Sequence, residues 1–220
     1  YAVHPSPVPV GYRRSVGEGI NIFAVESAID EVALTLGVDP LALRQQLLVN
    51  EPRSLAVLNA AANLAGWSTA PAAGRARGIA LSNGFGSITA LVLEISVPVA
   101  GTITVHKASC AVDCGYAVNP QNVEAQIQGG IVDGLTTALW GRVTFSSGVA
   151  SAKNFNNNRM LRLSECPTIT VQLVNTGGPL GGIGEAGVPP TAPALANAYA
   201  KLTGTRVRAL PIFPGATMTG

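Results

Sequence analysis

Residues 88–113 read ITALVLEISVPVAGTITVHKASCAVD, and this stretch decides the fold. Its first ten residues alternate between two faces, one formed by Ala90, Val92, Glu94 and Ser96 and the other by Thr89, Leu91, Leu93, Ile95 and Val97. A period of two predicts a strand over Ile88–Val97. Pro98–Gly101 indicates a short turn, and Thr102–Asp113 indicates a second strand. We therefore expect a hairpin here.

Helices are expected before this hairpin. Apolar residues at helical spacing predict a helix over Ile22–Leu36, followed by a glycine that ends it. Asp39-Pro40 pairs a capping residue with a first-turn proline, so a second helix should follow it. A third helix is expected over Leu55–Ala65, and the stretch Gly74–Gly78, GRARG, is interpreted as a solvated loop.

A longer helix should begin at Asn119-Pro120, after the hairpin, and reach about Trp140. Gln126, Gly130 and Gly134 lie beside its apolar stripe. Each glycine costs a helix about 1 kcal/mol relative to alanine. Something bulky must therefore approach this face closely, either a neighbouring backbone or a ligand.

The remaining elements complete an α+β fold in which a mixed sheet packs with helices. Short strands are expected over 143–145, 169–174 and 207–210, and a closing helix should run from about Thr191 to Gly204. The pattern divides into two subregions, a helical one over residues 1–70 with an irregular N-terminal arm, and a sheet-plus-helix one over residues 71–220.

Composition narrows the class of protein. Charged residues make up 12% of the 220 residues, against about 25% in a typical soluble domain, so we expect a partner to cover much of the surface. Lys+Arg 14 against Asp+Glu 12, with no basic cluster, argues against a nucleic-acid partner. No apolar run reaches the roughly 18 residues of a membrane span.

Cysteine and histidine usage argues against a metal held by this chain. Cys110 and Cys114 stand about 13 Å apart along the predicted strand, beyond disulfide reach, and with Cys166 they are interpreted as buried thiols. No CxxC pair suggests an iron–sulfur cluster, and there are only two histidines. We expect no metal ligand from this chain, so other chemistry must hold any metal that acts here.

The densest chemical signal is the stretch Gly177–Pro190, GGPLGGIGEAGVPP. Glycines permit close backbone approach, and a single acid, Glu185, stands among them just before a predicted helix start. Desolvation in such an apolar setting would make this carboxylate a candidate general base. A glycine-rich turn with a solvated glutamate fits the same residues equally well. The spacing matches neither a P-loop nor a GxGxxG motif.

Three further groups of polar residues can be interpreted from the sequence. The stretch Gly11–Gly17, GYRRSVG, could bind a phosphate-bearing cofactor through its arginines or form a surface turn. Gln126 could contact a ligand or cap a neighbouring backbone group. Glu26, Asp30 and Glu31 on the first helix are interpreted as a solvated edge.

Three stretches carry a family resemblance. They are GYRRSVGEGINIFAVESAIDEVA at 11–33, CAVDCGYAVNPQNVEAQIQGG at 110–130 and GGIGEAGVPPTAPALANAYAKLTGTRVRALPI at 181–212. In this order the chain resembles the C-terminal part of the molybdopterin-binding large subunit of the xanthine oxidase family. Within that family it is similar to the branch of isoquinoline 1-oxidoreductases and bacterial aldehyde dehydrogenases.

The resemblance implies a role for five residues. Glu185 matches the catalytic glutamate, which takes a proton from the molybdenum-bound hydroxyl. Arg14 matches an arginine at the molybdopterin site, and Gln126 matches a glutamine that hydrogen-bonds the pterin and would give the glycine-bearing helix face its close neighbour. Gly184 would let the backbone come near the metal, and Val16 would line the substrate pocket.

The resemblance also implies the reaction, cofactors and partners. The family oxidises N-heterocycles or aldehydes with water as the oxygen source. The cofactor would be a molybdenum pyranopterin, in its cytosine dinucleotide form in the bacterial branch, contacted by the arm within residues 1–70 and shared with another chain. Electrons would pass to [2Fe-2S] clusters on an iron–sulfur small subunit and on to an acceptor such as a cytochrome. The compartment would be bacterial periplasm, favoured slightly, or cytoplasm.

Upstream cofactor segments of the family are missing from these 220 residues. We therefore expect the chain to be one piece of a larger assembly, with the remaining part of the molybdenum-binding subunit as its partner. A non-catalytic structural or assembly module that shares the fold is the main alternative, although Glu185, Gln126 and Arg14 together argue against it. An unrelated hydrolase is disfavoured because no G-x-S-x-G motif is present.

Overall fold

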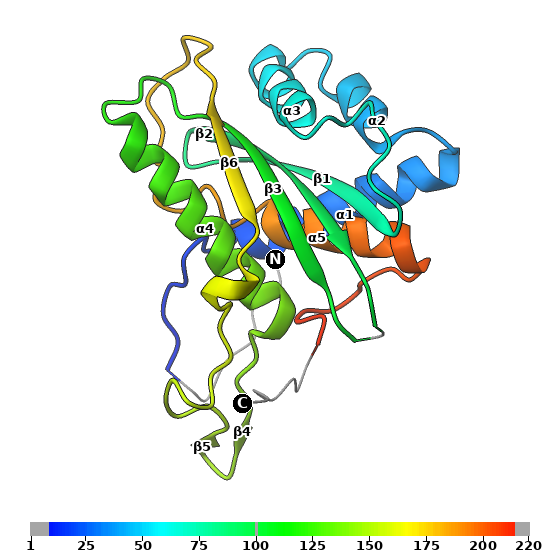
Figure 1. The fold of residues 1–220 in the computed structure, drawn as a ribbon. Helices are drawn as coiled ribbons and strands as arrows, with labels where there is room; N and C mark the ends of the chain where they lie inside the picture. The colour runs from blue at the N-terminus through cyan, green and yellow to red at the C-terminus, as the bar shows by residue number, and fades with distance from the viewer. Residues whose placement is uncertain (1–8, 100, 214–220) are drawn as a thin grey trace.

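A four-stranded mixed sheet lies at the centre of the molecule (Figure 1). The computed structural model describes residues 9–99 and 101–213. The sheet order is β1-β2-β3-β6, and the strands are β1 Arg75–Gly84, β2 Ser87–Ser96, β3 Thr104–Asp113 and β6 Thr168–Leu173. The first three strands are antiparallel, whereas β3 and β6 are parallel. The predicted α+β class with a mixed sheet is confirmed.

The predicted hairpin is present, with Ile88 opposite Asp113 and Glu94 opposite Lys107. Both faces of β2 are buried, because helices cover each side of the sheet. Leu91, Leu93 and their neighbours pack toward α4 and α5, while Val92 and its neighbours pack toward α3. The alternation of the sequence therefore sorts side chains between two cores rather than between core and water.

The described residues contain five α-helices and a short 3-10 helix, Leu163–Glu165. The α-helices are α1 Glu18–Leu36, α2 Pro40–Leu47, α3 Pro52–Leu64, α4 Pro120–Trp140 and α5 Thr191–Thr203. The predicted caps are confirmed: Asp39 accepts from two N–H groups of the first turn of α2, and Asn119 accepts from Asn122 N–H. Gly37 and Gly204 end α1 and α5 in the left-handed conformation.

The interpretation of Gly74–Gly78 as a loop is wrong, because β1 begins at Arg75. Arg75 and Arg77 look like solvated turn residues in the sequence. In the sheet both reach the nearly buried Glu94, with Arg75 Nη1–Oε1 at 3.0 Å and Arg77 Nε–Oε2 at 2.9 Å. A cross-strand ion pair thus stabilises a charged strand that periodicity alone does not reveal.

Two other short strands differ from expectation. Residues 207–210 form no strand; the chain there bends, and Ile212 N–H and Phe213 N–H donate to the carbonyls of Ala138 and Leu139 near the end of α4. The strand expected over 143–145 is instead a two-residue strand β4, Phe145–Ser146, paired with β5, Val149–Ala150.

The interpretation of Glu26, Asp30 and Glu31 as a solvated edge of α1 is wrong for the first two acids, whereas Glu31 is half-exposed and pairs with Arg208. Glu26 and Asp30, expected on a solvated edge, are buried. Arg44 Nε lies 2.8 Å from Glu26 Oε2, and Arg206 Nη1 lies 2.7 Å from Asp30 Oδ2. Desolvation raises the pKa of Glu26, although Arg44 acts against that shift. Several apolar side chains of α1 are exposed, Ile20 by 76%, whereas Ala33 is buried.

The division at residue 70 stays a prediction. Across it, α3 packs on β2 and β3, and α1 packs on α5. Within the described ranges, no helix has both the length and the apolar character needed to cross a membrane.

Candidate active site

The glycine-rich loop, Gly177–Gly187, lies between β6 and α5 in the chain. It contacts the β1–β2 turn and the turn after β3. Gly181 N–H donates to Cys114 O at 3.0 Å, and Gly182 N–H donates to Phe85 O at 2.7 Å. The Ser87 hydroxyl donates to Gly182 O at 2.8 Å. A Cβ added at Gly181 would lie 2.5 Å from the carbonyl carbon of Gly86. Glycine is thus required here because two backbones touch.

Arg14 joins three segments that lie far apart in the sequence. Its Nε donates to Gly184 O at 2.7 Å, and its Nη2 donates to Gln126 O at 3.1 Å and to Gln126 Oε1 at 3.0 Å. The structure therefore brings together Arg14, Gln126 and Gly184, which the sequence singled out separately.

Glu185 lies beside the same arginine-bearing turn. Its Oε2 accepts from Ser15 N–H at 3.0 Å, and its side chain is half-buried. Among the described residues, Oε1 has no hydrogen-bond partner. Ser15 has φ 85° and the β-branched Val16 has φ 38°, and a positive φ at such residues signals local strain. This strained turn directs a backbone donor at the carboxylate.

Val16, the predicted substrate-lining residue, follows Ser15 directly and is 41% exposed. Its role toward a substrate stays a prediction. Ser15 was missed in the sequence because its contribution is a backbone N–H, which no residue pattern reveals. The only available signal was its position between the arginines and a glycine in GYRRSVG.

The glycine-bearing face of α4 meets protein, not cofactor. A Cβ added at Gly130 would lie 2.9 Å from Gly187 Cα, and one at Gly134 would lie 2.6 Å from Thr191 Cβ. The expectation that the pterin is the close neighbour of this face is therefore wrong for these glycines. The neighbour is the end of the Glu185 loop and the start of α5.

This contact predicts different effects for two adjacent glycines. Gly130→Ala should lower the free energy of unfolding by about 1–3 kcal/mol, because the new methyl group meets backbone that cannot rotate away. In Gly129→Ala the nearest atom is Arg14 Nη1 at 3.7 Å, so we expect no loss and a gain of up to about 1 kcal/mol. Urea unfolding of both variants measures the difference. Equal stabilities would contradict the close contact.

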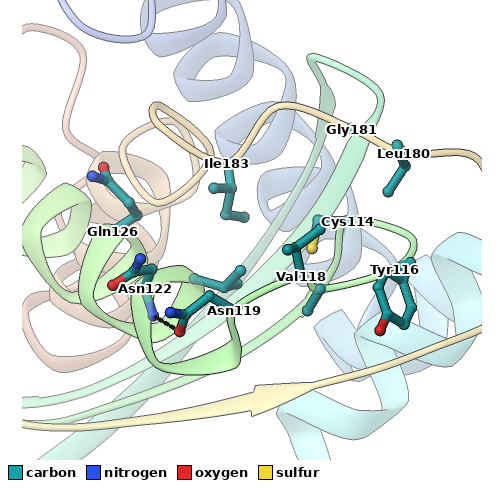
Figure 2. Close-up of a pocket in the computed structure, with 11 residues that line it drawn as sticks. Cys114, Tyr116, Val118, Asn119, Asn122, Gln126, Leu180, Gly181 and Ile183 are labelled. Carbon is teal, nitrogen blue, oxygen red and sulfur yellow. Dashed lines mark hydrogen bonds between the residues drawn. The ribbon is translucent and has the colours of Figure 1, made fainter.

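A pocket of about 310 Å³ adjoins Gln126. Figure 2 shows Gln126 and Asn122 on α4 at one end and Tyr116 at the other, with Ile183 of the glycine-rich loop above the space between them. It is lined by Cys114, Tyr116, Ala117, Val118, Asn119, Asn122, Val123, Gln126, Leu180, Gly181 and Ile183. Most of these side chains are apolar.

The donor groups at this site suit a ligand rich in acceptors. Gln126 Oε1 is occupied by Arg14, which leaves the Gln126 Nε2 amide and Arg14 Nη1 as donors. A Cβ at Gly184 would have no atom within 4 Å, so the backbone there can be approached. No group of His, Cys, Asp or Glu in the described part of the chain could hold a metal ion. The donors of Arg14 and Gln126 fit a cofactor that presents hydrogen-bond acceptors.

Comparison with known proteins defines the class. Residues 60–167 match the family described as molybdopterin cofactor-binding domain. The matched residues make up just under half of the chain, and the predicted resemblance to molybdopterin-binding subunits of the xanthine oxidase family is confirmed.

The particular relatives are bacterial. The beta subunit of isoquinoline 1-oxidoreductase from Brevundimonas diminuta is 37% identical over 211 residues, which are 94% of this chain and 27% of the relative. One of the subunits of nicotinate dehydrogenase from Pseudomonas putida is 34% identical over 224 residues, covering 93% of this chain and 19% of the relative. The chain thus spans about a quarter or less of the length of these proteins.

A solved structure supports the fold. The aldehyde oxidoreductase of Desulfovibrio desulfuricans superimposes with a TM-score of 0.68 over 91% of this chain and 40% of that protein. The sequence identity is 15%, so this likeness concerns the arrangement of helices and strands alone.

Proposed function

We propose that this chain is part of a molybdenum hydroxylase that oxidises an N-heterocycle or an aldehyde, with water as the oxygen source. The observation that carries the proposal is the convergence of Arg14, Ser15, Gln126 and Glu185 at one point from three distant segments. The names of the two relatives, which refer to isoquinoline and nicotinate, favour an N-heterocycle.

Glu185 would serve as the base. Ser15 N–H holds Oε2 in place, and Oε1 is the oxygen on which a proton can be accepted. When bound, the cofactor supplies two-electron redox chemistry and acidifies water. A carboxylate fixed at one oxygen and free at the other is suited to remove a proton at a defined position.

Arg14 and Gln126 would hold the cofactor. Each uses one polar atom of its side chain to bond the other, and each keeps a donor for a ligand, Arg14 Nη1 and Gln126 Nε2. Arg14 also bonds the carbonyl of the residue before Glu185, so the group that would contact the cofactor also fixes the position of the base. Val16 would border the substrate on the same turn.

The remaining components follow from the resemblance. We expect the cytosine dinucleotide form of the pyranopterin, shared with the remaining part of the molybdenum-binding subunit. Electrons would pass to [2Fe-2S] clusters on a small subunit and then to an acceptor such as a cytochrome. The resemblance favours the periplasm over the cytoplasm as the compartment.

Metal and pterin analysis of the intact complex tests this proposal. The purified complex should contain molybdenum and pterin, and Gln126→Met should retain both about 5- to 10-fold less tightly, the effect of a hydrogen bond worth about 1 kcal/mol. Gln128→Met is the matched control, because Gln128 lies on the same helix and its side chain donates to Glu124. A wild-type complex without molybdenum would refute the function.

A further inference from the structure

Asp113, the last residue of β3, is completely buried and lies outside the set of residues that would contact cofactor or substrate. Its Oδ2 accepts from Arg53 Nε at 2.9 Å and from the Thr176 hydroxyl. Its Oδ1 accepts from Gly115 N–H at 2.8 Å and from Arg53 Nη2 at 3.2 Å. Four donors therefore converge on one carboxylate.

These donors come from three places along the chain: α3, the turn after β3 and the entrance to the glycine-rich loop. Burial alone would raise the pKa of Asp113, but hydrogen bonds from Arg53, Thr176 and Gly115 outweigh it and lower the pKa to about 2. The carboxylate is charged at neutral pH, so every one of these bonds is charge-assisted.

Arg53 extends the connection to the β1–β2 turn. Its Nη1 donates to Gly86 O at 3.2 Å. The residues on either side of Gly86 are the ones that hold the loop, since Phe85 O accepts from Gly182 N–H and the Ser87 hydroxyl donates to Gly182 O. Arg53 and Asp113 thus bond to both turns on which the loop rests.

The loop also lies directly against these groups. A Cβ added at Gly178 would lie 2.7 Å from Arg53 Nε. A Cβ added at Gly115 would lie 2.5 Å from Pro179 O. A shift of the guanidinium or of the turn would therefore displace the loop backbone. The glycines have no side chains to pack, so these polar contacts help to fix the path of the loop, together with its backbone bonds, the Arg14–Gly184 bond and the packing of Ile183 and Ala186.

We propose that the Arg53–Asp113 pair is a positioning device that fixes the glycine-rich loop, Gly177–Gly187, so that Glu185 meets Ser15 N–H. This inference deepens the proposed function and rests on it for its catalytic consequence. The pair acts through the loop and touches neither cofactor nor substrate. Misplacement of a catalytic group by about 1 Å can lower a rate by about 10²-fold. Precise positioning of Glu185 would therefore offset the desolvation cost of burying the Arg53–Asp113 pair.

The test combines amide exchange with kinetics in the intact complex. In Asp113→Asn the amides of Gly181 and Gly182 should exchange at least about 10-fold faster, and kcat should fall about 10-fold, with KM and molybdenum content within about twofold of wild type. Arg53→Lys, which keeps the charge, should show smaller losses of both kinds than Asp113→Asn. Thr176→Val removes one donor and should give smaller changes in the same direction.

Glu94→Gln is the matched control. Glu94 is also a nearly buried acid with two arginine partners in this sheet, but it bonds no part of the loop. It should leave loop exchange and kcat unchanged. Unchanged loop exchange in Asp113→Asn and Thr176→Val, or faster exchange with unaltered kcat, would overturn the inference.

The failure of the proposed function has a different signature. If Glu185→Gln leaves turnover unaltered, the base assignment is wrong, whatever the exchange data show. Faster loop exchange in Asp113→Asn would then show that the pair holds the loop, and only the catalytic consequence of the inference would fail.

Discussion

Glu185→Gln is expected to lower kcat by about 10²- to 10⁴-fold, the usual contribution of a general base. The glutamine can keep the loop in place, because its amide oxygen can still accept the bond that Ser15 N–H now donates to Oε2. What it loses is the ability to take a proton. Steady-state kinetics on the intact complex, together with its molybdenum content, measure this separation of turnover from assembly.

Glu124→Gln provides the control for this change. Glu124 is an exposed residue of α4 whose contact is Gln128 at 3.2 Å, so the same chemical replacement should leave kcat unaltered. A Glu185→Gln complex that turns over at a near-normal rate would rule out the base assignment.

Gly78→Ala is expected to cause the largest loss of stability, about 3 kcal/mol, at the upper end of the cost of overpacking. Gly78 lies on β1 where α5 crosses the sheet. An added Cβ would lie 2.2 Å from Ala194 O and 2.4 Å from Ala198 N. Both atoms are helix backbone, so relief requires that α5 move away from the sheet.

Thermal and urea unfolding check this expectation, with a fall of several degrees in the melting temperature. Gly129→Ala is a suitable comparison, because its new methyl group meets nothing closer than 3.7 Å. If Gly78→Ala unfolds like wild type, the strand and helix are not in the close contact described. Helix α5 begins six residues after Glu185. The loss of stability in Gly78→Ala should therefore be accompanied by a fall in kcat that is smaller than the fall expected for Glu185→Gln.

Much of the fold could be predicted because its signals are local. The hairpin follows from alternation, and the caps Asp39 and Asn119 follow from residue type. Strand β1 was missed because Arg77 gains its partner, Glu94, only when the neighbouring strand β2 pairs with it, which the alternation of polar and apolar residues does not show. The buried acids of α1 were missed for the same reason, since Arg206 lies near the opposite end of the chain.

Prediction of the candidate site from the sequence was incomplete for a similar reason. The family resemblance singled out Arg14, Gln126 and Glu185, and the structure brings all three to one place. Sequence reasoning did not predict that Arg14 bonds protein on two sides, nor that Ser15 contributes its backbone. Such contacts depend on a left-handed turn and on chain segments more than 100 residues apart, which periodicity and composition do not encode.

The burial of two acids on α1, with apolar side chains exposed on its surface, has a practical consequence for surface redesign. Its buried acids, Glu26 and Asp30, dock the helix through Arg44 and Arg206, whereas Ile20 is largely exposed. Lysine or glutamate could replace Ile20 and other outward residues of the helix with little cost to folding. Such a variant would be a suitable starting point for preparing this chain without aggregation for spectroscopy.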